Sequence, residues 1–517
     1  MDGELNWPGL SMLPSKWPLS RVMNTNILER IAPGVARKSL PRWTAPALLA
    51  VSVPCALLLC GGNSDLISFC AAAGCFAVLG LGYLGLHGLR GMAWCSVPVL
   101  LTVRALAEFL GIPAWQLAMG NDALDSLYVR AMFLTLIGFA AFWLGSLVVK
   151  KEARLRFVPR SPATPSRTAF LSLAMLILGL GAKLLLWQTG LLSYTADAET
   201  REASLAFLQW LVFCANLLNG ALLVSAIEIL GKQSTRLLIR FVFWSALVFS
   251  VAFGAISGMK EELLKPIFYL VLVYGITRGR IPRAAYLLPL LLVLIYPFEN
   301  AYRANLDLGY RSEIRTVGGL GAVLKETFAD VVEGPASRSD IVGTGLESST
   351  GRLSLLTYVK DVVGLADPSL LNGDDKIWLA PVYAVVPRFL WKDKPDLNKG
   401  GRFSVLLGGS ETTASTLTPI GDLYAMYGTF WLAAGMLTYG ICVQIYMNWA
   451  SRGHSERNLF VYLSMLLSLS NLEATVVGIV SESVHLFFLV LITSYIIYGR
   501  QGFPLRVAKS RRLVAQF

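Results

Sequence analysis

The sequence predicts an all-α polytopic membrane protein with about twelve transmembrane helices and one large loop outside the cytoplasm. Hydrophobic residues make up 55% of the 517 residues and charged residues only 15%, whereas a soluble globular protein carries about 25% charged residues. Apolar runs of roughly 20 residues, which are long enough to cross a ~30 Å hydrocarbon core, recur along the chain. Lys and Arg are concentrated in alternate connecting segments, and this bias is typical of the cytoplasmic loops of membrane proteins.

Twelve apolar runs are the candidates for membrane spans. Each has the length of a transmembrane helix or slightly less. Prolines within them are tolerated, because neighbouring helices satisfy the freed backbone groups. The expected spans lie at residues 43–61, 65–86, 92–111, 128–149, 168–188, 206–230, 237–257, 264–277, 284–299, 427–448, 458–476 and 480–498.

The distribution of Lys and Arg predicts that both termini lie in the cytoplasm. In this orientation the inner segments hold 26 of the chain's 45 Lys and Arg residues. The opposite orientation would place the six basic residues of segment 150–167 outside in one short loop. The predicted order is a cytoplasmic leader (1–42), nine spans (43–298), a large outer loop (299–426), three spans (427–498) and a basic cytoplasmic tail (499–517).

The net charge of +12 follows from this topology, because most of the excess lies in cytoplasmic segments and in the tail. There it sets the orientation and contacts anionic lipid head groups. Nucleic-acid binding is not expected, because no recognition motif accompanies the charge. All seven Cys residues fall in predicted spans, so the sequence predicts neither a disulfide framework nor a zinc site.

Several ionisable residues lie inside the predicted spans. Arg104 and Glu108 are four residues apart and are expected to pair on one helix face; the pair either joins helices or forms part of a polar path. Lys183 lies near the outer end of its span and is expected to snorkel toward the head groups. His485 is the one histidine that the topology places at the outer face, and Glu482 lies one helical turn before it. A His near a carboxylate is a candidate general base; the alternative is an interfacial His satisfied by a neighbour.

The outer loop is not a basic domain, since its thirteen Lys and Arg residues face sixteen Asp and Glu. Its basic residues nevertheless form two local clusters, one directly after the ninth span and one within residues 388–402. Arginine suits a pyrophosphate, because its planar fork donates two parallel hydrogen bonds to phosphate oxygens. The alternative for each residue is a solvated, self-neutralising surface. The clusters are Arg303, Arg311 and Arg315, and Arg388, Lys392, Lys394, Lys399 and Arg402.

Three parts of this loop are expected to be ordered. Apolar residues at helical spacing predict two amphipathic helices, one over 317–328 and one over 353–363, that lie on the spans or on the membrane surface. The third part, 377–391, is nearly all apolar but too short to span, which favours an interfacial or re-entrant segment. It would hold the basic residues at its end at the depth of the lipid head groups.

Short motifs in and near the loop resemble those of the Wzy-type O-antigen and exopolysaccharide polymerases. They are PRFLWKDKP at 387–395, TPIGDLY at 418–424, and Tyr427-Gly428 leading into a span. The segment Ser257–Lys260 and the exit of the ninth span at Tyr302-Arg303 are similar too. The family often has Arg after Ser-Gly, and this chain has Met-Lys instead, which keeps the charge but loses the bidentate fork.

The resemblance implies a glycosyltransferase-C-like architecture in the bacterial inner membrane. Such polymerases take undecaprenyl-pyrophosphate oligosaccharides at the periplasmic face and transfer the growing glycan from one lipid carrier to the next. The resemblance implies no nucleotide sugar, no cofactor and no metal. The implied partners are the lipid-linked oligosaccharide, membrane lipids, and the chain-length regulator and flippase of the same pathway.

The implied chemistry assigns roles to the candidate residues. Without a metal, cationic side chains must stabilise the charge that develops on the leaving pyrophosphate. The acceptor hydroxyl needs a base, for which His485 and Glu482 are the candidates. Trp378, Trp391 and Tyr424 either stack on sugar rings or anchor the chain at the interface. The candidate cations are Arg303, Arg352 and Arg388, followed by Arg311, Arg315, Lys392, Lys394, Arg402 and Lys260.

Three other functions stay open. An O-antigen ligase-like transferase has a similar architecture but hands the glycan to a lipid A core. A flippase or other transporter is compatible with twelve spans, although transporters usually show internal repeats, which this sequence lacks. A non-catalytic scaffold of polysaccharide export would tolerate the loss of single outer arginines.

Overall fold

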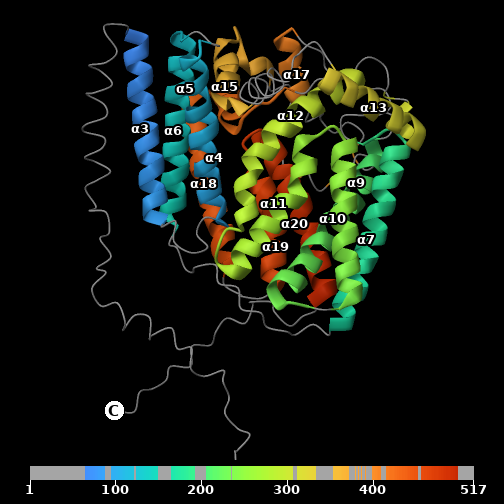
Figure 1. Ribbon diagram of the computed structural model, residues 1–517. Helices are drawn as coiled ribbons and strands as arrows, with labels where there is room; N and C mark the ends of the chain where they lie inside the picture. The colour runs from blue at the N-terminus through green and yellow to red at the C-terminus, as the bar shows by residue number, and fades with distance from the viewer. Residues whose placement is uncertain are drawn as a thin grey trace, which may run out of the picture. The chain divides into compact units, whose positions relative to one another are not determined.

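The computed structural model of the protein describes residues 64–87, 95–120, 124–149, 165–192, 205–234, 236–306, 311, 313–333, 353–371, 379, 382, 386, 391, 399–408, 415–451 and 456–498. The chain divides into a unit of residues 1–48, which lies outside the described part, and a unit of residues 49–517, which contains every element named below. All regular elements of the described residues are helices (Figure 1), as the all-α class requires.

Eight of the described helices are long and apolar enough to cross a membrane. Their positions coincide with predicted spans, so the prediction of a multi-pass helical membrane protein is confirmed. They are α3 (Ser64–His87), α4 continued by α5 (Val97–Leu106 and Ile112–Ala118), α6 (Ser126–Val148), α7 (Pro165–Gln188), α9 (Leu205–Ala226), α10 (Leu237–Ile256), α18 (Pro419–Ser451) and α20 (Val476–Tyr498).

Three further helices occupy predicted spans without meeting that standard of length and apolar character. α11 (Lys260–Arg278) begins with charged residues, α12 (Leu288–Asn305) has 18 residues, and α19 (Glu456–Leu469) has only 14. The first predicted span, 43–61, lies outside the described residues. The total of twelve spans therefore stays a prediction.

Glycines bring α6 and α18 into close contact. A Cβ atom at Gly145 would clash with the carbonyl oxygen of Leu437, and one at Gly440 would clash with that of Phe142. Small residues at helix crossings are typical of membrane proteins, because association there depends on close van der Waals packing. This contact fixes α18 against α6.

Three of the described helices are locally irregular, one of them α9, which continues as a π-helical turn over Ile227–Gly231. α18 is broken at Gly428, whose φ of 76° and ψ of −169° are not helical; the predicted outer loop thus ends earlier than 426, since a short helix begins at Pro419. A π-helical turn, Ala107–Gly111, joins α4 to α5. Such turns are rare in proteins, and those that occur are often found at functional sites.

The described parts of the large loop are helical where the apolar spacing predicts it. α13 (Val317–Glu333) covers the first predicted amphipathic helix and α15 (Leu355–Gly364) most of the second; α17 (Lys399–Leu406) was not predicted. The predicted re-entrant segment 377–391 lies almost wholly outside the described residues. The buried face of α15 consists of Leu355, Leu356, Val359, Val362 and Val363.

These loop helices lie together at one end of the bundle (Figure 1). It is the end where α6 begins and α7 finishes. The indole nitrogen of Trp187 in α7 donates to the carbonyl oxygen of Ile314 at 2.6 Å, and the hydroxyls of Tyr128 in α6 and Thr357 in α15 lie 3.1 Å apart. The topology predicted from Lys and Arg assigns the same side to these connections.

Candidate functional site

The turn between α10 and α11 is held by the end of α12. The hydroxyl of Tyr302 donates to the carbonyl oxygen of Ile256 at 2.9 Å. Arg303 Nε donates to the carbonyl oxygen of Gly258 at 2.5 Å. Tyr302 is buried and Arg303 is half-buried. Two motifs that lie more than forty residues apart in the chain therefore form one junction at the loop end of the bundle.

Lys260, the first residue of α11, belongs to the same junction. Its Nζ donates to Asn300 Oδ1 of α12 at 3.1 Å. The preceding turn is stabilised locally, since the Ser257 hydroxyl accepts from the Met259 amide at 3.2 Å and donates to the Gly254 carbonyl at 2.7 Å. The junction thus presents two cationic side chains on a fixed backbone.

The other predicted cations are distributed differently. The Arg315 guanidinium packs against Gly190. Its Nε lies 2.6 Å from the position that a Cβ atom would take at residue 190. Arg402 Nη1 donates to the carbonyl oxygen of Leu371 at 3.4 Å, and Arg311 is half-buried. The structure thus places these three at other points of the loop end. The remaining candidates lie outside the described residues: Arg352, Trp378, Arg388, Lys392 and Lys394.

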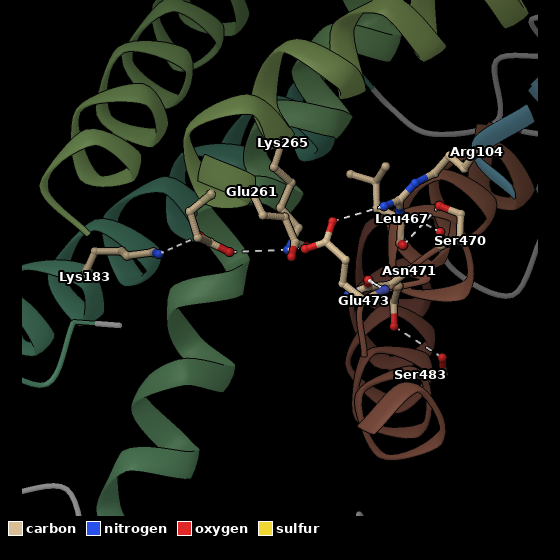
Figure 2. Close-up of polar contacts among 11 residues, drawn as sticks. Arg104, Lys183, Glu261, Lys265, Leu467, Ser470, Asn471, Glu473 and Ser483 are labelled. Carbon is tan, nitrogen blue, oxygen red and sulfur yellow. Dashed lines mark hydrogen bonds and ion pairs between the residues drawn. The ribbon is translucent and has the colours of Figure 1, made fainter. Parts of the chain in front are cut away.

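Charged side chains of α7 and the start of α11 form a row of ion pairs (Figure 2). Glu262 Oε2 accepts from Lys183 Nζ of α7 at 3.1 Å, and its other oxygen lies 3.3 Å from Lys265 Nζ. Lys265 Nζ also lies 3.6 Å from Glu261 Oε1. The Lys183 side chain is 12% exposed and pairs with Glu262, a partner that the sequence did not predict.

Glu262 is the most strongly stabilised anion of this row. It precedes the apolar part of α11 and is flanked by two ammonium groups. The nearby Lys265 ammonium lowers the pKa of Glu262 to about 2, and Lys183 acts in the same direction against the effect of burial. Glu262 is therefore a permanent carboxylate that holds the two lysines together, and it is a poor proton acceptor.

Arg104 of α4 extends the row toward the end of α19. Its Nε donates to Glu108 Oε1 at 2.8 Å, its Nη1 to the carbonyl oxygen of Ser470 at 2.9 Å, and its Nη2 to Glu473 Oε1 at 3.2 Å. Figure 2 shows the Arg104 side chain next to the turn after α19, where it meets Glu473. The pairing with Glu108 agrees with the sequence prediction. The contacts with Ser470 and Glu473 could not be predicted, because they join residues more than 360 positions apart.

A small cavity lined by both polar and apolar side chains lies between α7, α9, α11, α19 and α20. The cavity has a volume of about 30 Å³. This is enough for about two water molecules. Glu482 of α20 and Lys265 of α11 both line it, with Tyr269 beside them. His485 is half-buried on α20 and is not among the lining residues. The two predicted bases therefore lie in different surroundings. Other polar lining residues are Asn216, Asn219, Ser464 and Thr493.

A buried ion pair ties the loop to α20. Lys399 Nζ of α17 lies 2.9 Å from Asp422 Oδ1, and both side chains are at most 1% exposed. The second oxygen of Asp422 accepts from the Val476 amide, the first of α20, at 2.8 Å. A carboxylate at a helix N-terminus is favoured by the unpaired amides and the helix dipole. Asp422, which belongs to the TPIGDLY motif, thus has a structural role that its sequence position did not reveal.

These residues can stabilise an anionic group and accept a proton. Arg303 and Lys260 supply positive charge at the junction. Glu261 and Glu473 supply accessible carboxylates, since their side chains are 60% and 49% exposed. Among the described residues, no group of three or more His, Cys, Asp or Glu side chains could hold a metal ion.

The comparisons with known proteins leave the family open. The resemblance to the Wzy-type polymerases rests on the short motifs quoted above. No family model, curated protein or solved structure matches this chain.

Proposed function

We propose that this protein polymerises undecaprenyl-pyrophosphate-linked oligosaccharide repeat units at the periplasmic face of the bacterial inner membrane. The observation that carries the proposal is the junction at which Arg303 and Lys260 meet the α10–α11 turn. It brings two separated motifs of the resemblance together at the loop end of the bundle. A lipid-linked pyrophosphate presents its charge at this depth, where the head groups meet water.

The reaction is a glycosyl transfer between two lipid carriers. A hydroxyl oxygen of the acceptor sugar forms a bond to the anomeric carbon of the donor glycan. The bond from that carbon to the pyrophosphate oxygen breaks, and the oxygen leaves with the bonding electrons. Arg303 and Lys260 stabilise the charge that develops on the pyrophosphate, since hydrogen-bond donors fixed beforehand are worth several kcal/mol in such a step. The acceptor proton passes to a base, for which Glu482 and His485 are the candidates from the sequence.

The orientation is part of the proposal. Short connections rich in Lys and Arg lie at the end of the bundle opposite the loop helices, which favours that end as cytoplasmic. Among the described connections on that side, residues 278–283 hold Arg278, Arg280 and Arg283. The large loop then faces the periplasm, where the chain-length regulator and the flippase of the pathway would meet this protein.

A deletion strain with complementation tests the proposal. Loss of a polymerase leaves glycans with a single repeat unit, whereas loss of a ligase leaves long glycans on the lipid carrier. Loss of a flippase leaves no outer glycan at all. Complementation with Arg303→Ala is expected to keep single units, and the matched control Arg283→Ala, on the opposite end, is expected to restore the full ladder. A full ladder in the deletion strain itself would refute the proposal.

A further inference from the structure

The chain between α19 and α20 leaves the helical conformation inside the bundle. Residues 470–475 are not helical, and the hydroxyl of Tyr439 in α18 donates to the carbonyl oxygen of Leu469 just before them. α18 is broken at Gly428, near the loop end, and Tyr439 lies roughly 16 Å further along the helix. The turn that Tyr439 contacts is therefore deep in the bundle. Non-helical backbone at such a depth occurs only where it is buried in protein or lines a water-filled cavity.

Arg104 fixes this turn in place. Its three donor nitrogens bind Glu108, the Ser470 carbonyl and Glu473, so the guanidinium has a single orientation. The amide of Glu473 also donates to Asn471 Oδ1 at 2.9 Å, which tightens the turn. Two carboxylates face one guanidinium, and this trio therefore keeps one uncompensated negative charge. Glu261 lies close enough to contribute to the electrostatics of Arg104 as well.

Glu473 is the accessible carboxylate of this trio. Its side chain is 49% exposed, whereas that of Glu108 is 10% exposed. Its Oε1 binds Arg104, and its Oε2 has no hydrogen-bond partner among the described residues. A charged side chain at this depth does not face lipid, because exposure of a charge to hydrocarbon is unfavourable. The exposed side of Glu473 therefore faces water.

We infer that Glu473 is the carboxylate that accepts the proton of the acceptor sugar hydroxyl, and that Arg104 is the residue that positions it. This inference rests on the proposed function and names the acceptor subsite. Glu482 suits the role less well, because it lines a small cavity between helices that has room for only about two water molecules. Glu262 is excluded by its two lysine partners.

The proton transfer completes the step already described. The acceptor hydroxyl donates to Glu473 Oε2 while its oxygen bonds to the anomeric carbon of the donor. The proton moves to Oε2 as the pyrophosphate leaves, and it is later released to water. Arg104 keeps Oε1 occupied, so that Oε2 alone points to the acceptor. Glu108 binds the same guanidinium from the buried side.

Complementation of the deletion strain tests this assignment. Glu473→Gln keeps the shape and the hydrogen bond to Arg104 but removes the base, and general-base catalysis typically contributes about 10²–10⁴-fold. We expect single repeat units on gels, with a normal amount of protein in the membrane. Arg104→Gln should fail similarly, and Arg104→Lys should recover part of the ladder because it keeps the charge. The control Glu313→Gln, an exposed carboxylate of the loop end, should restore the full ladder.

A second measurement checks accessibility without any glycan. Glu473→Cys, in a variant whose native Cys residues are replaced, should react in intact cells with a maleimide that cannot cross the inner membrane. Absence of labelling would overturn the inference. So would a full ladder from Glu473→Gln in a strain whose deletion accumulates single units, and that result would leave the proposed function intact. A full ladder in the deletion strain would overturn both.

Discussion

The buried pair of Lys399 and Asp422 gives the sharpest prediction for stability. Both side chains are at most 1% exposed, so neither charge can be solvated when its partner is removed. Asp422→Asn keeps an oxygen for the Val476 amide but leaves the Lys399 ammonium uncompensated. Among the described residues, Lys399→Met leaves the Asp422 carboxylate with the Val476 amide as its remaining donor.

The expected magnitudes follow from this geometry. Removal of one member of a buried ion pair costs about 3–5 kcal/mol, whereas replacement of both by neutral groups of similar volume is often close to neutral. Asp422→Asn should therefore fall near the upper end, about 4–5 kcal/mol. Lys399→Met should fall near about 3 kcal/mol, because Asp422 keeps one hydrogen bond. The double variant should lose less than either single one.

Unfolding of the purified protein by increasing SDS in mixed micelles measures these free energies. The two single variants and the double variant form a cycle, and contacting residues are expected to be non-additive. Additive losses, or single variants within about 0.5 kcal/mol of the unchanged protein, would refute the reasoning. Val476 provides a second check, since loss of the pair should loosen the start of α20 and speed hydrogen exchange there.

Three further predictions concern packing, charge and the junction. Gly440→Ala should destabilise the protein by about 1–3 kcal/mol, because the new Cβ meets the Phe142 carbonyl. The control Gly82→Ala should not, because no atom lies within 4 Å of the new Cβ. Equal effects of the two variants on SDS unfolding would contradict this prediction. Glu262 has a lowered folded pKa of about 2 against an ordinary 4.5, so its contribution to stability is present above about 4.5 and is lost as the pH falls toward about 2. Glu262→Gln should therefore flatten the loss of stability in that acid range, and an unchanged slope would contradict the ion pairs. Tyr302→Phe should cost about 1 kcal/mol in the same unfolding assay through its hydrogen bond to Ile256, and Tyr286→Phe, at an exposed position, is the matched control that should cost nothing.

The sequence was sufficient for the helical framework, because length and apolar character alone decide whether a segment can cross a membrane. The predicted span 128–149 and the observed α6 at Ser126–Val148 differ by two residues at one end and one at the other. The boundary at 426 was less accurate. The short helix from Pro419 to the break at Gly428 falls in the predicted loop, but its contacts with α6, α15 and α20 make it part of the bundle.

The candidate site was predictable only where partners are near in sequence. Arg104 and Glu108 share a helix face, so their pairing could be foreseen. Lys183 could not be assigned to Glu262, because nothing in a sequence shows that a side chain of α7 reaches the start of α11. Glu473 gave no signal either, since an acidic residue in a short connection is typical of a solvated turn. Its significance comes from the depth of that turn and from Arg104.

Reconstitution tests the central claim most directly. Purified protein in lipid vesicles would be supplied with undecaprenyl-pyrophosphate-linked single repeat units, and the products separated by glycan length. A polymerase should yield lipid-linked dimers, trimers and longer chains, with one free lipid pyrophosphate for each new glycosidic bond, and Arg303→Ala should yield neither. Single units that stay unchanged, or that only move across the bilayer, would contradict the proposed function.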